Sequence, residues 1–133
     1  MNQITKPKIL IVDDEADMLD YMESRLNRII ECEIEKVSSG VTAIEKMKAN
    51  NYDMVILDIK MPDKSGMDVI REVKKAKALP FVFVVTAYSS PQIASEAIME
   101  GARDYQAKPL DLKIFDFKIK QGLESLGKLI DKR

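Results

Sequence analysis

The stretch Ile9-Leu-Ile-Val-Asp-Asp-Glu15 decides the fold, because a short apolar run ends abruptly in three acids. Its first four residues are mostly β-branched, which is typical of a strand buried on both faces of a parallel sheet. Further apolar runs predict four more strands, of which the first is weaker and suits a sheet edge and the last is very short: Ile34–Val37, Met54–Leu57, Phe81–Val85 and Tyr105–Ala107.

Helical periodicity fills the segments between these runs. The first helix follows Glu15, and one of its faces carries Met18, Leu19, Met22 and Leu26. Four residues form the predicted buried face of the second helix: Val41, Ile44, Met47 and, through its apolar stem, Lys48. The same reasoning predicts three further helices: Gly66–Lys77, Pro91–Glu100 and Leu110–Leu126.

Strand followed by helix, five times over, predicts an α/β domain with a parallel sheet and right-handed crossovers. In a chain of 133 residues, five strands favour the doubly wound, flavodoxin-like (βα)5 arrangement with strand order 2-1-3-4-5. A closed eight-stranded barrel needs far more chain. We expect the domain to span residues 8–127, with an N-terminal extension at 1–7 and a C-terminal tail or linker stub at 128–133.

Composition excludes several kinds of chemistry. The chain has no histidine and one cysteine, which excludes histidine-based triads, multi-cysteine zinc sites and an internal disulfide framework. A formal net charge of -1 argues against a general electrostatic footprint for nucleic acid. The apolar runs are too short to span a bilayer and the first residues lack a signal-peptide pattern, so we expect a cytoplasmic protein without membrane contact.

Carboxylates converge at the predicted switch point of the sheet. In strand order 2-1-3-4-5, ligands bind between the carboxyl ends of the first and third strands. Asp13 and Asp14 follow the first strand, and Asp58 follows the third. Carboxylates crowded at one point repel one another, and a divalent cation such as Mg²⁺ relieves that repulsion. The alternative is that Asp13 and Asp14 only cap a helix, which does not explain why Asp58 meets them.

A hydroxyl and an ammonium complete the same edge. Thr86 ends the fourth strand and Lys108 follows the fifth. Beside a metal ion, these groups would bind a phosphoryl group, with Asp58 either as nucleophile or as a metal ligand. Taken singly, Thr86 is a strand-end threonine and Lys108 a surface lysine; together they favour a site. The sequence contains no glycine-rich phosphate loop that would support a bound nucleotide.

Four segments resemble the receiver domain of two-component response regulators. They occur in the family's order and spacing, and the similarity runs from about Lys8 to Leu126. The segments are Lys8-Ile-Leu-Ile-Val-Asp-Asp-Glu15, Asp58-Ile-Lys-Met-Pro-Asp-Lys-Ser-Gly-Met-Asp68, Val84-Val-Thr-Ala87 and Gly101-Ala-Arg-Asp-Tyr-Gln-Ala-Lys-Pro109.

The resemblance assigns roles to these residues. It implies that Asp58 accepts the phosphoryl group and that Lys108 contacts it. It also implies a Mg²⁺ (or Mn²⁺) site formed by Asp13, Asp14, Asp58 and the backbone carbonyl of Lys60. Thr86 and Tyr105 resemble the family's switch pair, and Lys108-Pro109 resembles its cis peptide. The predicted fourth helix, fifth strand and fifth helix form the surface that binds partners or a second copy of the chain.

The implied function is a signalling module, not a turnover enzyme. The phosphoryl group would come from a sensor histidine kinase or a histidine phosphotransfer protein, because this chain has no histidine of its own. A downstream effector or a fused output domain would read the switched surface. Two other functions stay open: an aspartate-based, Mg²⁺-dependent phosphohydrolase, which Asp13-Asp14-Glu15 fits poorly, and an interaction module that has lost phosphorylation.

Overall fold

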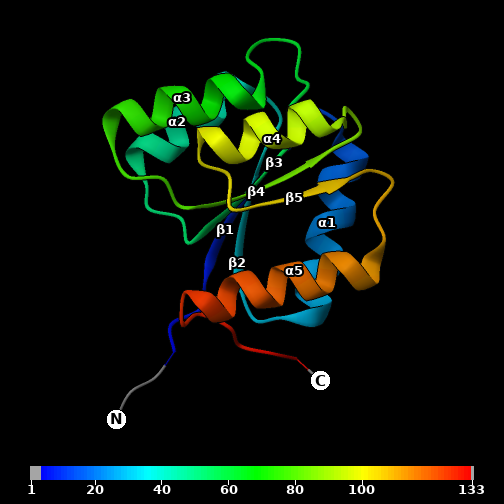
Figure 1. The fold of residues 1–133 in the computed structure, drawn as a ribbon. Coiled ribbons are helices and arrows are strands. Elements are labelled where there is room, and N and C mark those ends of the chain that lie inside the picture. Colours follow the sequence, from blue (N-terminus) through cyan, green and yellow to red (C-terminus); the bar gives the residue numbers. More distant parts are fainter. Residues whose placement is uncertain (1–3, 133) are drawn as a thin grey trace.

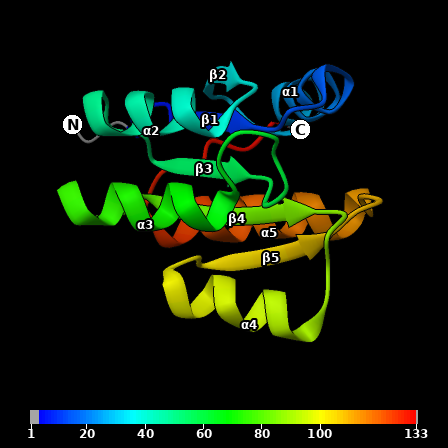
Figure 2. The ribbon, with the colours of Figure 1, turned by 90° about the horizontal axis from the view of Figure 1, so that it is seen from above.

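Five parallel strands form one sheet in the order β2-β1-β3-β4-β5 (Figure 2). The computed structural model describes residues 4–132. It confirms the predicted fold class and strand order, and the strand order reverses between the neighbouring strands β1 and β3. The strands are β1 (Lys8–Val12), β2 (Glu33–Val37), β3 (Met54–Leu57), β4 (Phe81–Thr86) and β5 (Asp104–Ala107).

Helices cover both faces of the sheet (Figure 1). On one face α1 (Ala16–Ile29) and α5 (Leu112–Ser125) pack against the sheet, and the rings of Phe83 and Phe115 stack with centroids 6.0 Å apart. The other face is covered by α2 (Gly40–Ala49), α3 (Gly66–Ala76) and α4 (Pro91–Glu100). Because side chains alternate along a strand, neighbouring residues of β1 and β3 enter opposite cores, which explains why Ile9–Val12 and the whole of β3 are apolar.

The predicted buried face of α2 is correct for Met47 and for Ile44, which is half-buried against the core, and wrong for Val41 and Lys48. Val41 is 46% exposed and Lys48 is also exposed, whereas Gly40, Ala43 and Met47 are buried. The β3–α3 loop explains the difference, since a Cβ atom on Gly40 would lie 2.6 Å from the Cβ atom of Lys64. Contact with this loop turns the small residues of α2 inward and leaves Val41 at the surface.

The helix ends follow local sequence chemistry. Ser65 caps α3 in a capping box with Asp68, and Ser90 caps α4, which begins with Pro91. Gly101 ends α4 with a φ of 128°. The last helix is shorter than predicted because Asp111 caps it, accepting hydrogen bonds from the backbone N–H groups of the first turn.

The segment 128–132 pairs with the α1–β2 connection. The N–H of Glu31 donates to the carbonyl of Ile130, and the N–H of Lys132 donates to that of Ile29, both at 2.9 Å. These bonds form an antiparallel bridge, so most of the predicted tail packs on the domain. Positions 1–3 of the predicted extension and position 133 of the tail lie outside the described residues. Within residues 4–132, no helix combines the length and apolar character needed to cross a bilayer.

Candidate functional site

The predicted site residues meet at the carboxyl end of the sheet. Asp13 follows β1, Asp58 follows β3, Thr86 ends β4 and Lys108 follows β5. Backbone hydrogen bonds between neighbouring strands continue as far as these residues. The N–H of Asp58 donates to the carbonyl of Val12 at 3.0 Å, and the N–H of Lys108 donates to the carbonyl of Thr86 at 2.9 Å. Regular parallel pairing therefore places side chains from four strands beside one another.

Three carboxylates form a cluster suited to a cation. Asp13, Asp14 and Asp58 each offer an oxygen atom, and these oxygens lie within 4.8 Å of one another. Asp13 is fully buried and Asp58 is 5% exposed, while Asp14 faces solvent. Burial raises the pKa of Asp13, and hydrogen bonds from Lys108 and from the N–H of Glu15 oppose that shift. The all-oxygen set, open to water beside Asp14, fits Mg²⁺.

Lys108 is the cation that neutralises part of this cluster. Its Nζ atom lies 2.7 Å from Oδ2 of Asp13 and 3.2 Å from Oδ2 of Asp58, with Glu15 at 3.6 Å. Burial alone would lower the pKa of Lys108, but the hydrogen bonds and charges of Asp13 and Asp58 together raise it. The ammonium thus stays charged, and the three carboxylates that it contacts still leave an excess of negative charge.

A pocket of about 530 Å³ opens over the cluster. The hydroxyl of Thr86, which is fully buried, accepts a hydrogen bond from the N–H of Tyr88 at 3.1 Å. The Nζ atom of Lys60 lies 5.3 Å from the ring centroid of Tyr88, a cation–π contact at the pocket mouth. The lining residues are Asp14, Glu15, Asp58, Lys60, Met61, Pro62, Thr86, Ala87, Tyr88 and Lys108.

The backbone of Lys60 lies beside Asp58. Its N–H donates to Oδ1 of Asp58 at 3.4 Å, the long end of hydrogen-bond distances. Oδ1 is therefore held more weakly than Oδ2, which contacts Lys108. The two oxygens of this carboxylate differ in how firmly they are engaged.

Tyr105 lies on the same face of the sheet as Thr86. It pairs with Val84, two residues before Thr86, and packs against the core under α2, α3 and α4. Its hydroxyl is buried and has no hydrogen-bond partner among residues 4–132. The peptide bond Lys108-Pro109 is cis, as the resemblance implied.

Asp63 is a residue to which the sequence assigned no role. It lies in the β3–α3 loop, and its carboxylate oxygens accept hydrogen bonds from the N–H groups of Gly40 at 3.0 Å and Val41 at 2.9 Å. These backbone donors, with that of Lys64, lower the pKa of Asp63 to about 2. The contact joins segments more than twenty residues apart, and no local pattern around Asp63 indicates it.

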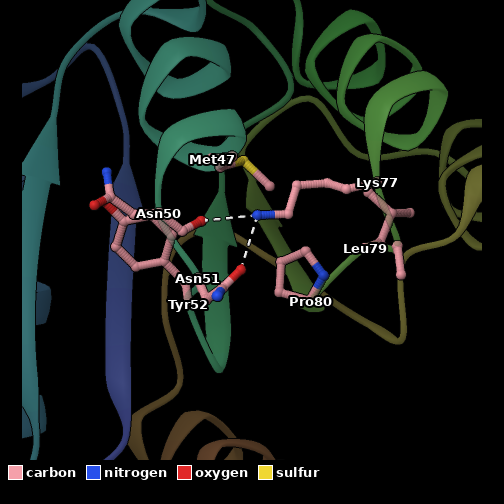
Figure 3. A pocket seen from close by; sticks show the side chains of 8 residues that line it. Met47, Asn50, Asn51, Tyr52, Lys77, Leu79 and Pro80 are labelled. Carbon is pink, nitrogen blue, oxygen red and sulfur yellow. Dashed lines mark hydrogen bonds between the residues drawn. The ribbon is translucent and has the colours of Figure 1, made fainter.

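A second pocket lies at the amino end of the sheet (Figure 3). It measures about 150 Å³, and Lys77 lies at its centre, donating to the carbonyl of Asn50 at 3.2 Å and to Oδ1 of Asn51 at 2.9 Å. Tyr52 and Pro80 line it, and none of its described lining residues is a carboxylate. Its polar contacts join the end of α3 to the α2–β3 connection and are structural.

The fold and the acidic cluster together define a flavodoxin-like domain whose switch point carries carboxylates suited to a cation. Residues 9–119 match the family model described as "Response regulator receiver domain". The chain belongs to this family. It is a phosphoacceptor domain of a two-component system and a signalling module, not a turnover enzyme.

Similar proteins and structures agree with this family. The transcriptional regulatory protein ZraR of Klebsiella oxytoca is 32% identical over 115 residues, covering 86% of this chain and 26% of that protein. The transcriptional regulatory protein ResD of Bacillus subtilis (strain 168) is 32% identical over 120 residues, covering 90% of this chain and 49% of that protein. This chain thus spans about a quarter to a half of these relatives.

Two solved structures illustrate the shared fold. The signal receiver domain of a putative Luxo repressor protein from Vibrio parahaemolyticus has a TM-score of 0.86 and 25% identity, covering 92% of this chain and 94% of that one. A response regulator receiver domain protein from Clostridium thermocellum has a TM-score of 0.78 and 32% identity, covering 91% and 97%.

Proposed function

We propose that Asp58 accepts a phosphoryl group from a partner histidine kinase or histidine phosphotransfer protein, in a reaction that requires Mg²⁺. The observation that carries this proposal is the position of Lys108, which contacts both Asp13 and Asp58 beneath an open pocket. One ammonium among several carboxylates leaves negative charge for a cation to bind. Asp13, Asp14, Asp58 and the Lys60 carbonyl are the ligands that would hold it.

The contacts of Asp58 support a role as nucleophile. Oδ2 is engaged by Lys108, so the more weakly held Oδ1 is the oxygen free to attack phosphorus. In the transfer a new O–P bond forms as the P–N bond of the donor phosphohistidine breaks, and the partner's imidazole keeps the electron pair of that bond. Bound Mg²⁺ would neutralise charge on the phosphoryl oxygens. Lys108 would donate to one of these oxygens from its present position.

Thr86 and Tyr105 are the proposed switch. The Thr86 hydroxyl accepts from Tyr88, so its own proton is available to a phosphoryl oxygen. Tyr105 has a buried hydroxyl without a partner among the described residues, so a shift of Thr86 would change what that ring packs against. Such a local event can bias a two-state element.

The surface that would respond comprises α4, β5 and α5. It exposes Met99 (83%) and Phe117 (63%), large apolar side chains that a partner could cover. The relatives named above are longer transcriptional regulators, which supports a fused output domain or a separate effector as the reader of this surface. A second copy of the chain is the other occupant that we propose for it.

The test is labelling with acetyl phosphate and Mg²⁺, followed by mass spectrometry of the intact chain. We expect one phosphoryl group on the parent protein and none on Asp58→Asn. Asp53→Asn is the matched control, because Asp53 lies at the amino end of the sheet and binds the N–H of Lys8. Undiminished labelling of Asp58→Asn would overturn the assignment.

A further inference from the structure

We propose that Asp63 is a positioning residue of the phosphorylation site. By binding the first turn of α2, it would fix the β3–α3 loop and with it the Lys60 carbonyl, which is one of the proposed Mg²⁺ ligands. The inference rests on the proposed function of Asp58, and it adds α2 to the parts of the fold on which metal binding depends.

The β3–α3 loop is anchored at its two ends. The side chains of Ile59 and Met61 are 6% and 8% exposed and pack in the core. At the other end, the N–H of Gly66 donates to the carbonyl of Ile59 at 2.7 Å, which closes the loop on itself. Between these anchors the residues 62–64 are exposed and add no side chain to the core.

Asp63 is the polar tether of this exposed tip. Its two oxygens accept separately from Gly40 and Val41, so the carboxylate holds α2 with a two-point contact that fixes direction as well as distance. The N–H groups at a helix start have no partner within the helix, and the helix dipole favours an anion there.

The packing around the tether is tight. A Cβ atom on Gly40 would lie 2.6 Å from both the Cβ and the carbonyl oxygen of Lys64, so the loop backbone runs directly against the start of α2. Two features of the sequence contribute separately to this contact: the absence of a side chain at Gly40 and the carboxylate of Asp63. Without the acid, the loop would still pack against Gly40 through Lys64, but it would lack the hydrogen bonds that orient it relative to α2.

The consequence concerns Lys60, which is three residues from Asp63 and lies between the anchors Ile59 and Met61. A carbonyl ligand must point at the ion, and groups that orient ligands commonly change metal affinity by about 10-fold or more. We therefore expect Asp63→Ala to weaken Mg²⁺ binding although every proposed ligand is still present.

The experiment compares Asp63→Ala with Ser39→Ala. Ser39 caps the same helix by accepting from the N–H of Thr42 at 3.2 Å, but it belongs to the β2–α2 connection. Both variants lose a cap of α2, whereas Asp63→Ala alone releases the β3–α3 loop. Calorimetric Mg²⁺ titration should give a Kd raised about 10-fold for Asp63→Ala and close to the parent value for Ser39→Ala. Labelling by acetyl phosphate should recover in Asp63→Ala at saturating Mg²⁺.

Equal Mg²⁺ affinities for the two variants would overturn the inference. If Asp63→Ala does not fold, Asp63→Asn, which keeps one acceptor oxygen, provides the same comparison. Failure of the proposed function looks different: the parent protein would then bind Mg²⁺ but take up no phosphoryl group. In that case the titration still decides whether Asp63 orients the metal site.

Discussion

The two ends of the sheet each contain a lysine that donates hydrogen bonds, but the electrostatic environments of the two lysines differ. At the carboxyl end, Lys108 is buried against Asp13 and Asp58, and unbalanced negative charge remains. At the amino end, Lys77 donates to a backbone carbonyl and to the neutral amide of Asn51 (Figure 3). Lysine contacts alone thus do not distinguish a functional site from a structural one. The difference is that the carboxylates around Lys108 carry more negative charge than the lysine neutralises, whereas the groups that Lys77 contacts are neutral.

A lysine–tyrosine pair at each end repeats the contrast. Lys8 lies 5.2 Å from the ring centroid of Tyr52, and Lys60 lies 5.3 Å from that of Tyr88. Tyr52 is 7% exposed and its hydroxyl binds Glu35, so burial and this carboxylate raise the pKa of its phenol. Tyr88 is 54% exposed over the pocket. Tyr52 of the amino-end pair packs in the core, whereas Tyr88 of the carboxyl-end pair lies exposed beside the pocket.

Removing the lysine at each end of the sheet is the strongest test of this comparison. Lys108→Met leaves two buried carboxylates without their cation, and we expect the free energy of unfolding at neutral pH to fall by about 3 kcal/mol. Lys77→Met loses hydrogen bonds to neutral groups and should cost about 1 kcal/mol. Urea unfolding without Mg²⁺ measures both. Equal losses would mean that the two ends do not differ in electrical balance.

Mg²⁺ should stabilise the domain by binding at the carboxyl end of the sheet and not at the amino end. At a free concentration one hundred times the Kd, binding to the folded state adds about 2.7 kcal/mol to the free energy of unfolding, and a chelator removes this gain. Asp14→Asn should lose most of it, since Asp14 is an exposed member of the cluster. Asp53→Asn, at the amino end, should keep it. Thermal unfolding with and without Mg²⁺ gives the comparison, and a retained gain in Asp14→Asn would contradict it.

The smallest effect concerns the exposed tyrosine. Tyr88 and Lys60 lie at the pocket mouth, where we expect them to limit the approach of water to a phosphoryl group on Asp58. Tyr88→Ala should shorten the lifetime of that group by about threefold to tenfold, equivalent to about 0.7–1.4 kcal/mol in the barrier. Tyr88→Phe keeps the ring and should retain the parent lifetime. Decay of the labelled protein measures both variants, and an unchanged lifetime in Tyr88→Ala would remove this role.

Sequence reasoning succeeded where regular structure alone determines position. The ends of parallel strands share one edge, so Asp13, Asp58 and Lys108 could be placed together from strand order. It failed at α2, where Val41 was expected in the core, and it assigned no role to Asp63. Both depend on one contact between the start of α2 and a loop more than twenty residues away. Periodicity and local motifs carry no information about such a contact.

Gly66 shows how little space the backbone after Asp58 leaves for a side chain. A Cβ atom there would lie 2.4 Å from the carbonyl oxygen of Asp58 and 2.9 Å from the Cα atom of Ile59. Any larger residue would have to push the backbone of Asp58 and Ile59 away from its present position. We expect a homologue or engineered variant with a side chain at this position to keep the full set of acids, hydroxyl and lysine in its sequence and still fail to take up a phosphoryl group. The presence of the reactive side chains therefore does not by itself show which members of the receiver family can signal.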